Sequence, residues 1–358
     1  MSAQATRNIE RQPLLVGEVI ELARDFVSQD FAKREGFWGA YLTGSINRMD
    51  PDTAFPAYLD VDIRVVLASA VRDEVEALQY QGYLLDCNIT PSGDYQSSEA
   101  ILPLPGKACH FVGNHILLDS RERLGRLQED VSAAFGRRQW VARRVASSLA
   151  SARAALGALK SATDTVGTLH ALGEFLLYAC ASISIAHLAP PTHRRALVNL
   201  RSITQTHAAS ALHAHALAAL GSDQLETQET RHFLQHCIDA FDRGLAVKRQ
   251  PVPFNWMLHP CLRSYLQDGA LELIDEGAHR EAIFWLLRFF HIAIAAIRQD
   301  GTPQDKLLHG NHLMRFLAAL GLESTAALQT RILLCESLVA EIDAYTQGVI
   351  ATSPLLVD

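Results

Sequence analysis

Apolar and polar positions follow two different periods along the chain, and the period changes near residue 120. In the first part, apolar residues come in short runs or alternate with polar ones, which is typical of strands. Residues 13–31 instead have helical spacing and would cover the sheet, and residues 90–106, rich in Pro, Ser and Gly, are predicted to form a connecting loop. The pattern predicts strands over residues 37–42, 59–67, 82–89 and 115–118, and a short helix-like segment over residues 73–80.

From residue 120 onward, apolar residues recur three and four positions apart, and strand signals almost vanish. Prolines and glycines separate the periodic segments. We therefore predict an α+β protein, in which a small mixed-sheet domain of the α/β or α+β kind, residues 1–119, precedes an all-helical bundle domain, residues 120–358. The predicted helices cover residues 121–135, 138–160, 165–188, 193–220, 226–247, 267–276, 280–297, 311–320 and 324–348.

Two carboxylates interrupt the predicted strand over residues 59–67. Asp60 and Asp62 stand two positions apart, so both project from one face, while Val61 and Ile63 turn into the core. A divalent cation between them would account for two like charges on one side of a strand. Magnesium prefers carboxylate oxygens and keeps water or phosphate as its remaining ligands. A solvated outer face of the sheet would give the same pattern, so the two aspartates alone leave both interpretations open.

A Gly-Ser pair follows the first predicted strand. Gly44 allows a sharp turn and the close approach of a phosphate. Ser45, where a following helix would begin, offers an amide and a hydroxyl to an oxyanion. The pair therefore predicts a phosphate contact, although Gly-Ser turns also occur in ordinary loops.

A third carboxylate, Asp86, lies among apolar residues of the predicted strand over residues 82–89. An unpaired buried carboxylate is costly, so a partner is required. We expect Asp86 to lie beside the metal of Asp60 and Asp62, as a ligand or as the base that takes a proton from an attacking hydroxyl.

Taken together, Gly44-Ser45, then Asp60-Val61-Asp62 on a strand and Asp86 on a later strand resemble the nucleotidyltransferase superfamily that includes polymerase beta and the aminoglycoside nucleotidyltransferases. The resemblance covers the first domain. It implies that Asp60 and Asp62 hold two magnesium ions, that Asp86 completes one metal site, and that the Gly-Ser turn holds the nucleotide phosphates.

One departure from the family concerns the segment between Ser45 and Asp60, which is longer than the usual spacing. Arg48 in this segment is a further candidate for nucleotide binding. The layout, with a helical second domain, is similar to that of the aminoglycoside nucleotidyltransferases, in which this domain forms the other wall of the substrate cleft.

The resemblance implies an adenylyltransferase-type enzyme that moves a nucleoside monophosphate, AMP from ATP by first choice, to a hydroxyl group and releases pyrophosphate. A small acceptor such as an aminoglycoside-like antibiotic fits the net charge of -7 and the two-domain layout. A nucleic-acid partner is disfavoured, because phosphate backbones require a basic surface. Two alternatives stay open, namely a toxin-like member that modifies a protein or RNA, and a non-catalytic nucleotide-binding regulatory protein.

The helical domain contains charged residues with two interpretations each. Glu174 lies in an apolar segment. Its carboxylate could anchor a substrate or, more simply, form a structural ion pair. Arg194 and Arg195 open a predicted helix after Pro190-Pro191 and could anchor a phosphate or be exposed at the helix start. The basic side of the helix over residues 138–160 could contact a triphosphate, but a solvated helix face is the favoured interpretation.

Histidines in the same domain form two pairs. His232 and His236 are one helical turn apart, and His309 and His312 are three residues apart. Zinc would need further ligands that no spacing identifies, so ordinary surface or core histidines are favoured.

The cysteines and the apolar stretches help to predict the cellular location of the protein. The six cysteines contain no Cys-x-x-Cys pair and are predicted to be reduced thiols. The first residues are polar, which is unlike a secretory signal or transit peptide, and the apolar stretch over residues 175–191 is predicted to be a buried helix because polar residues interrupt it. We therefore expect a cytoplasmic protein without a membrane span.

Overall fold

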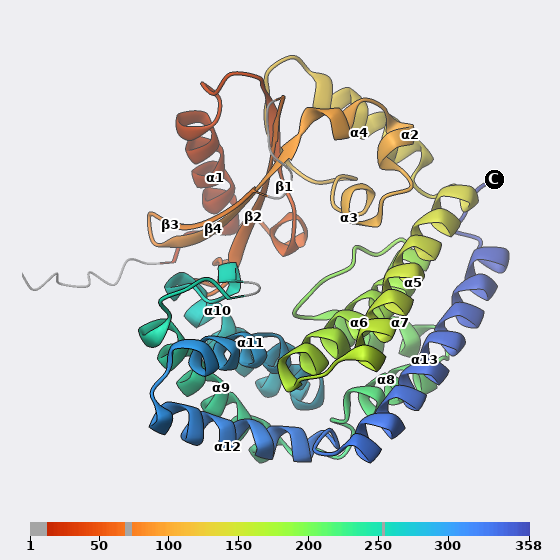
Figure 1. Ribbon diagram of the computed structural model, residues 1–358. Coiled ribbons are helices and arrows are strands. Elements are labelled where there is room, and N and C mark those ends of the chain that lie inside the picture. The colour runs from red at the N-terminus through yellow and green to blue at the C-terminus, as the bar shows by residue number, and fades with distance from the viewer. Residues whose placement is uncertain (1–12, 69–73, 253–254) are drawn as a thin grey trace, which may run out of the picture.

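The computed structural model describes residues 13–68, 74–252 and 255–358, so the first twelve residues of the predicted first domain lie outside it. A mixed five-stranded sheet comes first in the chain, and the elements after it that the structure describes are helical (Figure 1). This arrangement confirms the predicted α+β class. The sheet part consists of α1 (Val16–Asp30), β1 (Phe37–Leu42), the 3-10 helix η1 (Ser45–Arg48), β2 (Asp60–Leu67), β3 (Glu74–Tyr80), β4 (Tyr83–Pro91) and β5 (Ile116–Asp119).

The strands lie in the order β3-β4-β2-β1-β5. β1 is antiparallel to β2 and to β5, β3 is antiparallel to β4, and β2 is parallel to β4. The central position of β2 follows from its sequence, because a strand with neighbours on both sides buries its apolar residues best. The parallel pairing of β2 with β4 brings the predicted carboxylates onto neighbouring strands.

The two faces of the sheet bury different sets of side chains. On one face, alternate residues such as Val61, Ile63 and Leu85 pack with the apolar side of α1. On the other face, Tyr41 packs with Tyr95 beneath the short helices α2 (Ser98–Ile101) and α3 (Pro105–Ala108) and the longer α4 (Arg123–Ala134). Figure 1 shows α1 and α2–α4 on opposite sides of the sheet.

The helical part has one large apolar core, to which α6 and α11 contribute long buried stretches. α6 alone is long and apolar enough, among the described helices, to cross a membrane, and 83% of its apolar window is buried inside the protein. That burial fits the predicted core helix. The helices are α5 (Arg138–Ser161), α6 (Thr165–Ala186), α7 (Ala196–Thr206), α8 (Ser210–Leu220), α9 (Thr227–Val247), α10 (Arg263–Asp275), α11 (His279–Asp300), α12 (Pro303–Ala319) and α13 (Thr325–Thr352).

The two parts are joined by buried contacts. Leu84 of β4 belongs to the core of the helical part. Arg144 of α5 is fully buried and donates hydrogen bonds to the carbonyls of Leu102, at 2.9 Å, and Phe135, at 2.7 Å. A guanidinium that is buried without such acceptors would be costly, so Arg144 fixes α5 against the α2 and α4 region. Arg144 therefore does not contribute to a basic surface.

Four sequence predictions differ from the structure. The predicted helix over residues 311–320 begins earlier, at Pro303 of α12, because proline is favoured in the first turn of a helix. The helix-like segment over residues 73–80 is wrong where described, because Glu74–Tyr80 is the edge strand β3; Asp73 lies outside the described residues. The predicted loop over residues 90–106 contains the end of β4, a 3-10 turn at Ser92–Tyr95, α2 and the start of α3. The predicted helix over residues 193–220 is two helices, α7 and α8.

Each difference has a local cause. β3 and β4 form a hairpin through Gln81 and Gly82, whose φ angles are +50° and +93°, as a tight two-residue hairpin turn requires. Pairing with β4 thus decides the state of residues that resemble a helix in isolation. The break between α7 and α8 lies at Ala208, which has a φ of +55° without the glycine or proline that marks such a break in a sequence.

Candidate metal and nucleotide site

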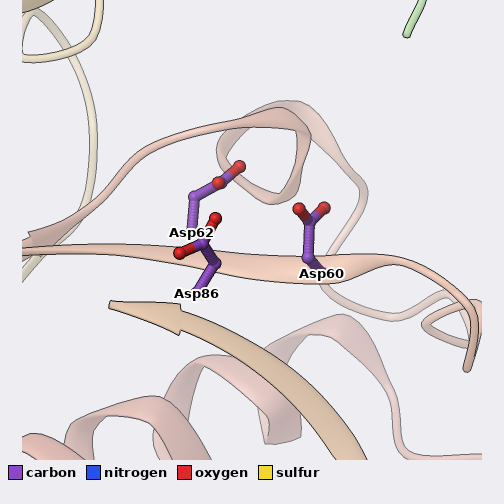
Figure 2. Close-up of side chains that lie close together, drawn as sticks. All are labelled: Asp60, Asp62 and Asp86. Carbon is purple, nitrogen blue, oxygen red and sulfur yellow. The ribbon is translucent and has the colours of Figure 1, made fainter. Parts of the chain in front are cut away.

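The three predicted carboxylates meet on one face of the sheet. Asp62 of β2 lies directly opposite Asp86 of β4, and Asp60 lies two residues before Asp62. One ligand oxygen from each side chain lies within 4.8 Å of those of the other two. Figure 2 shows the three side chains close together, with Asp60 and Asp62 on one strand and Asp86 beside them. The parallel register of β2 and β4 therefore builds a cluster that the strand spacing alone only suggests.

Gly44 lies against this cluster. Its φ is +73°, and a Cβ atom there would lie 2.0 Å from Oδ2 of Asp62. The backbone N–H of Thr43, the preceding residue, donates a 2.8 Å hydrogen bond to the carbonyl of Asp62. Only glycine combines this backbone conformation with so close an approach. The turn after β1 is thus fitted to the carboxylate.

Ser45 and Arg48 begin and end η1, as the prediction of a helix start at Ser45 requires. Both side chains are exposed, so they are accessible to a ligand. Asn47, which the sequence did not single out, holds this turn: its Nδ2 donates to the carbonyl of Thr43 at 3.0 Å, and its Oδ1 accepts from the backbone of His115 at 2.9 Å. No sequence signal distinguishes this asparagine from those in ordinary turns.

Mutual repulsion and burial dominate the electrostatics of the cluster. Burial, followed by the charge of Asp86, raises the pKa of Asp60 to about 7. Burial, followed by the charges of Asp60 and Asp86, raises the pKa of Asp62 well above its usual value. Burial also raises the pKa of Asp86, and the guanidinium of Arg64 opposes that rise. Three ionised carboxylates this close need a cation to offset their repulsion.

The residues fit a divalent metal. Oδ1 of Asp86 is buried and has no hydrogen-bond partner among the described residues, which leaves a lone pair for a ligand. All three side chains are partly buried rather than sealed, so a cation can reach them. Carboxylate oxygens are the donors that magnesium prefers. The site thus has the donor set of a magnesium centre.

A tyrosine from the helical part reaches the cluster. The hydroxyl of Tyr265, on α10, hydrogen-bonds Asp60 and lowers its pKa, against the larger effect of burial. Burial and the charges of Asp60 and Asp62 in turn raise the pKa of Tyr265 well above its usual value. Its ring packs edge-on against Trp285 with centroids 5.1 Å apart. Sequence reasoning missed this residue, because nothing local marks a core tyrosine as close to a distant aspartate.

Arg194 and Arg195 lie near the start of β2. Arg194 is buried, donates to the carbonyl of Gly269 at 2.8 Å and pairs with Glu272 of α10. Arg195 pairs with Glu276 at 2.7 Å. Both guanidinium groups are thus engaged with α10 and not with an open helix start, although the charge of Arg194 still lowers the pKa of Asp60. A phosphate contact by either residue stays a prediction.

Glu174 forms a structural ion pair, the simpler of its two interpretations. Its Oε1 lies 2.8 Å from Nη1 of Arg288 on α11. Burial would raise the pKa of Glu174, but the charge and hydrogen bond of Arg288 outweigh burial, so the pKa lies below its usual value. A carboxylate held in this way is ionised at neutral pH, unlike a buried general base.

Comparisons with known proteins leave the family open. No protein-family model matches the chain, and no curated protein matches it. Among solved structures, a nucleotidyltransferase-like protein from Exiguobacterium sibiricum 255-15 is 12% identical, with a TM-score of 0.30, over 85% of this chain and 89% of that chain. Similarity at this level is too weak to indicate a shared function, so any functional assignment depends on the geometry of the site.

Proposed function

We propose that the chain is a magnesium-dependent nucleotidyltransferase. The observation that supports this proposal is the cluster of Asp60, Asp62 and Asp86, with ligand atoms within 4.8 Å of one another, beside a glycine whose missing Cβ leaves room for Asp62. A protein that only binds a nucleotide has no need for three clustered negative charges next to a nucleoside triphosphate. A transferase does, since bound magnesium supplies the positive charge that neutralises the phosphates and the pyrophosphate that leaves.

Each side chain of the site would have its own role in the proposed reaction. Asp60, Asp62 and Asp86 hold the metal, with two ions expected from the family resemblance. Asp86, through its unpartnered Oδ1, is the group best placed to accept a proton from an attacking hydroxyl. Gly44 lets the turn approach the phosphates, and the exposed Ser45 offers its hydroxyl to them. Arg48, at the end of η1, is a further phosphate contact in this proposal.

ATP is the proposed donor, and a small hydroxyl-bearing compound the proposed acceptor. The acidic net charge of -7 favours a cationic acceptor such as an aminoglycoside over RNA. With an aminoglycoside as acceptor, the proposed role of the protein is in antibiotic resistance. A cytoplasmic location belongs to the same proposal, because the nucleotide is available there.

A transfer assay with α-labelled ATP, GTP, CTP and UTP tests this proposal. Magnesium is supplied, and an aminoglycoside panel, total RNA and a cell lysate are offered as acceptors in parallel. We expect label from ATP in the aminoglycoside fraction, and a loss of at least about 100-fold in Asp60→Ala and in Asp62→Ala. Asp52→Ala, an exposed carboxylate in the connection between η1 and β2, is the matched control and should retain activity.

Other outcomes select among the alternatives. Label in RNA or in a lysate protein would replace the small acceptor by the toxin-like activity while keeping the chemistry. Magnesium-dependent nucleotide binding without transfer would favour a regulatory protein. Full activity in Asp62→Ala would exclude the assigned site.

A further inference from the structure

Four basic side chains meet where the sheet part faces the helical part. Arg48 ends η1, Arg64 lies on β2, His110 follows α3, and His193 lies in the connection between α6 and α7. The charges of His193, Arg64 and Arg48 all act on His110, so these groups lie close together. In Figure 1, the connection between α6 and α7 lies on the side of the helical part that faces α3. Arg48, Arg64, His110 and His193 thus form one basic cluster between the two parts.

Neighbouring hydrogen bonds fix the backbone that carries the two histidines. Nδ2 of Asn114 donates to the carbonyl of His110 at 2.9 Å. In the helical part, Arg194, the residue after His193, donates to the carbonyl of Gly269 at 2.8 Å. Each part of the protein therefore presents one imidazole from a backbone that is held in place.

No acidic side chain pairs with the basic cluster among the described residues. The side chains of Arg48, His110 and His193 have neither a hydrogen bond nor an ion pair within that part of the chain. Nη1 of Arg64 donates to the hydroxyl of Thr90 at 3.3 Å, and a neutral hydroxyl does not cancel its charge. Burial lowers the pKa of Arg48, which shows that its charge is partly desolvated. A partly desolvated cation is costly without an opposite charge, and an anionic ligand would supply one.

The carboxylate nearest to this cluster in the helical part is already engaged. Glu174 of α6 acts on His193, but its Oε1 lies 2.8 Å from Nη1 of Arg288, whose effect on His193 is larger. The helical part thus adds no net negative charge at His193. An anion from outside the chain would therefore meet no repulsion from Glu174.

Arg64 connects the basic cluster to the carboxylates of β2 and β4. It stands two residues after Asp62, so both side chains project from the same face of the sheet. Its charge lowers the pKa of Asp62 and of Asp86, against the larger effect of burial, and it also acts on His110. The basic cluster therefore adjoins the proposed metal.

Both imidazoles are neutral at pH 7 in the unliganded protein. Burial, followed by the charges of His193, Arg64 and Arg48, lowers the pKa of His110 to about 4. Burial is also the first cause that lowers the pKa of His193 to about 4, although part of this side chain is accessible to solvent. An anion among these groups would favour the charged form of imidazole. Because two charged rings would repel each other, the pair would take up one proton before a second.

We infer that the basic cluster binds the terminal phosphates of a nucleoside triphosphate, and that the His110–His193 pair takes up one proton from solvent as they bind. The identity of the ligand rests on the proposed function. Arg48 and Arg64 supply permanent charge, and the protonated imidazole adds a charged donor. Since the free pair is neutral and the bound pair is protonated, binding tightens as the pH falls, by up to about tenfold per pH unit. The phosphates would also bridge the sheet part and the helical part.

Calorimetric titration with inorganic tripolyphosphate, in the presence of chelator, tests this inference on the full chain. We expect the dissociation constant to fall at least about threefold from about pH 7.5 to about pH 6.5. Heats measured in two buffers of different ionisation enthalpy should show proton uptake. His193→Gln should remove the proton-linked part of both effects, and comparison with this variant cancels the protonation of tripolyphosphate itself. Should His193→Gln fail to fold, His110→Gln carries the same prediction.

His312→Gln is the matched control. Burial also lowers the pKa of His312, but its ring stacks on that of His236, between α12 and α9, with centroids 3.8 Å apart. This variant should keep the pH dependence. Its loss in His312→Gln, or its retention in His193→Gln, would overturn the inference. Absence of binding, or equal affinity at both pH values in the unmodified protein, would do the same.

Two further measurements separate this inference from the proposed function. Asp62→Ala should keep proton-linked binding of tripolyphosphate while losing nucleotide transfer. ATP should displace tripolyphosphate at least about tenfold better than inorganic phosphate does. Equal displacement would indicate a general anion site and overturn the assignment to a triphosphate. Transfer by a protein whose tripolyphosphate binding is independent of pH would overturn this inference alone, whereas proton-linked binding without transfer would support the site and contradict the proposed function.

Discussion

At Gly44, the backbone conformation and a neighbouring carboxylate leave room for a hydrogen atom and nothing larger. A methyl group there would lie 2.0 Å from Oδ2 of Asp62, and the φ of +73° disfavours any side chain. The carboxylate is a flexible neighbour, so Asp62 and not the strand would move. The expected damage is therefore to the proposed metal site more than to the fold.

Gly44→Ala tests this expectation. We predict a fall in nucleotide transfer of about 100-fold or more, since a displacement of about 1 Å of a catalytic group has that effect. Stability should fall by only about 1 kcal/mol. Transfer rate and denaturant unfolding measure the two effects separately.

Gly82→Ala is the matched control. Gly82 has a φ of +93° in the β3–β4 turn, but nothing lies within 4 Å of the position of an added Cβ atom. The two variants share backbone strain and differ in the contact with a carboxylate. Equal activity in both would contradict the assigned role of Gly44.

At the scale of elements, the parallel pairing of β2 with β4 places Asp62 opposite Asp86. In the metal-free protein, the ionised carboxylates of the two residues therefore repel each other. A carboxyl group whose folded pKa is raised stabilises the fold when protonated. For Asp60, that stabilisation is fully present below the ordinary value of 3.8 and is lost as the pH rises through about 7.

Metal-free protein should therefore lose stability as the pH rises from about 4 to about 7. Asp60→Asn should reduce this loss by about 1–2 kcal/mol, a discounted figure because the side chain is partly exposed. Magnesium should restore stability at the higher pH in the unmodified protein only. Denaturant unfolding with chelator and with Mg²⁺ measures both effects. An identical pH dependence in the variant and the unmodified protein would refute ionisation of Asp60 as the cause of the loss.

The sequence predicted β1, β2, β4 and β5 because their apolar patterns reflect burial directly. It missed β3, whose strand state depends on pairing through the Gln81-Gly82 turn. The break at Ala208 has no glycine or proline to reveal it. Asp60, Asp62 and Asp86 were predictable because carboxylates among apolar strand residues need a partner. Tyr265 and Asn47 were not, since their roles arise from contacts across long sequence separations.

For the whole molecule, the helical part completes the site that the sheet part begins. Tyr265 of α10 hydrogen-bonds Asp60, and Arg194 beside α10 lies over the ring of Tyr58, 5.8 Å from its centroid. In Figure 1, α10 lies next to the sheet at the end where β2 begins. The helical part therefore influences the acidity of a carboxylate on β2.

Tyr265→Phe should expose this influence. Loss of the hydroxyl removes a hydrogen bond that lowers the pKa of Asp60, so that pKa should rise by about half a unit to one unit. In the metal-free protein, the pH at which the stabilisation by protonated Asp60 is lost should shift upward by the same amount, as measured by denaturant unfolding with chelator.

Tyr345→Phe serves as its control. The Tyr345 hydroxyl lies 2.9 Å from Nε2 of His187, so this variant also loses one tyrosine hydrogen bond of the helical part. The pH dependence of its stability without metal should match that of the unmodified protein. A common shift in both variants would indicate a general loss of stability instead of a direct effect on Asp60.

The shared core around Leu84 has a consequence for synthesis of the protein. Leu84 leaves the ribosome with β4, whereas most of the helical residues that bury it are translated much later. Until then, the nascent sheet carries an apolar side chain and a cluster of acids on a surface without its cover. Exposed apolar surface in incomplete chains favours aggregation, and chaperones counter it. The helices that are translated later therefore cover the surface of the sheet part, which is translated first.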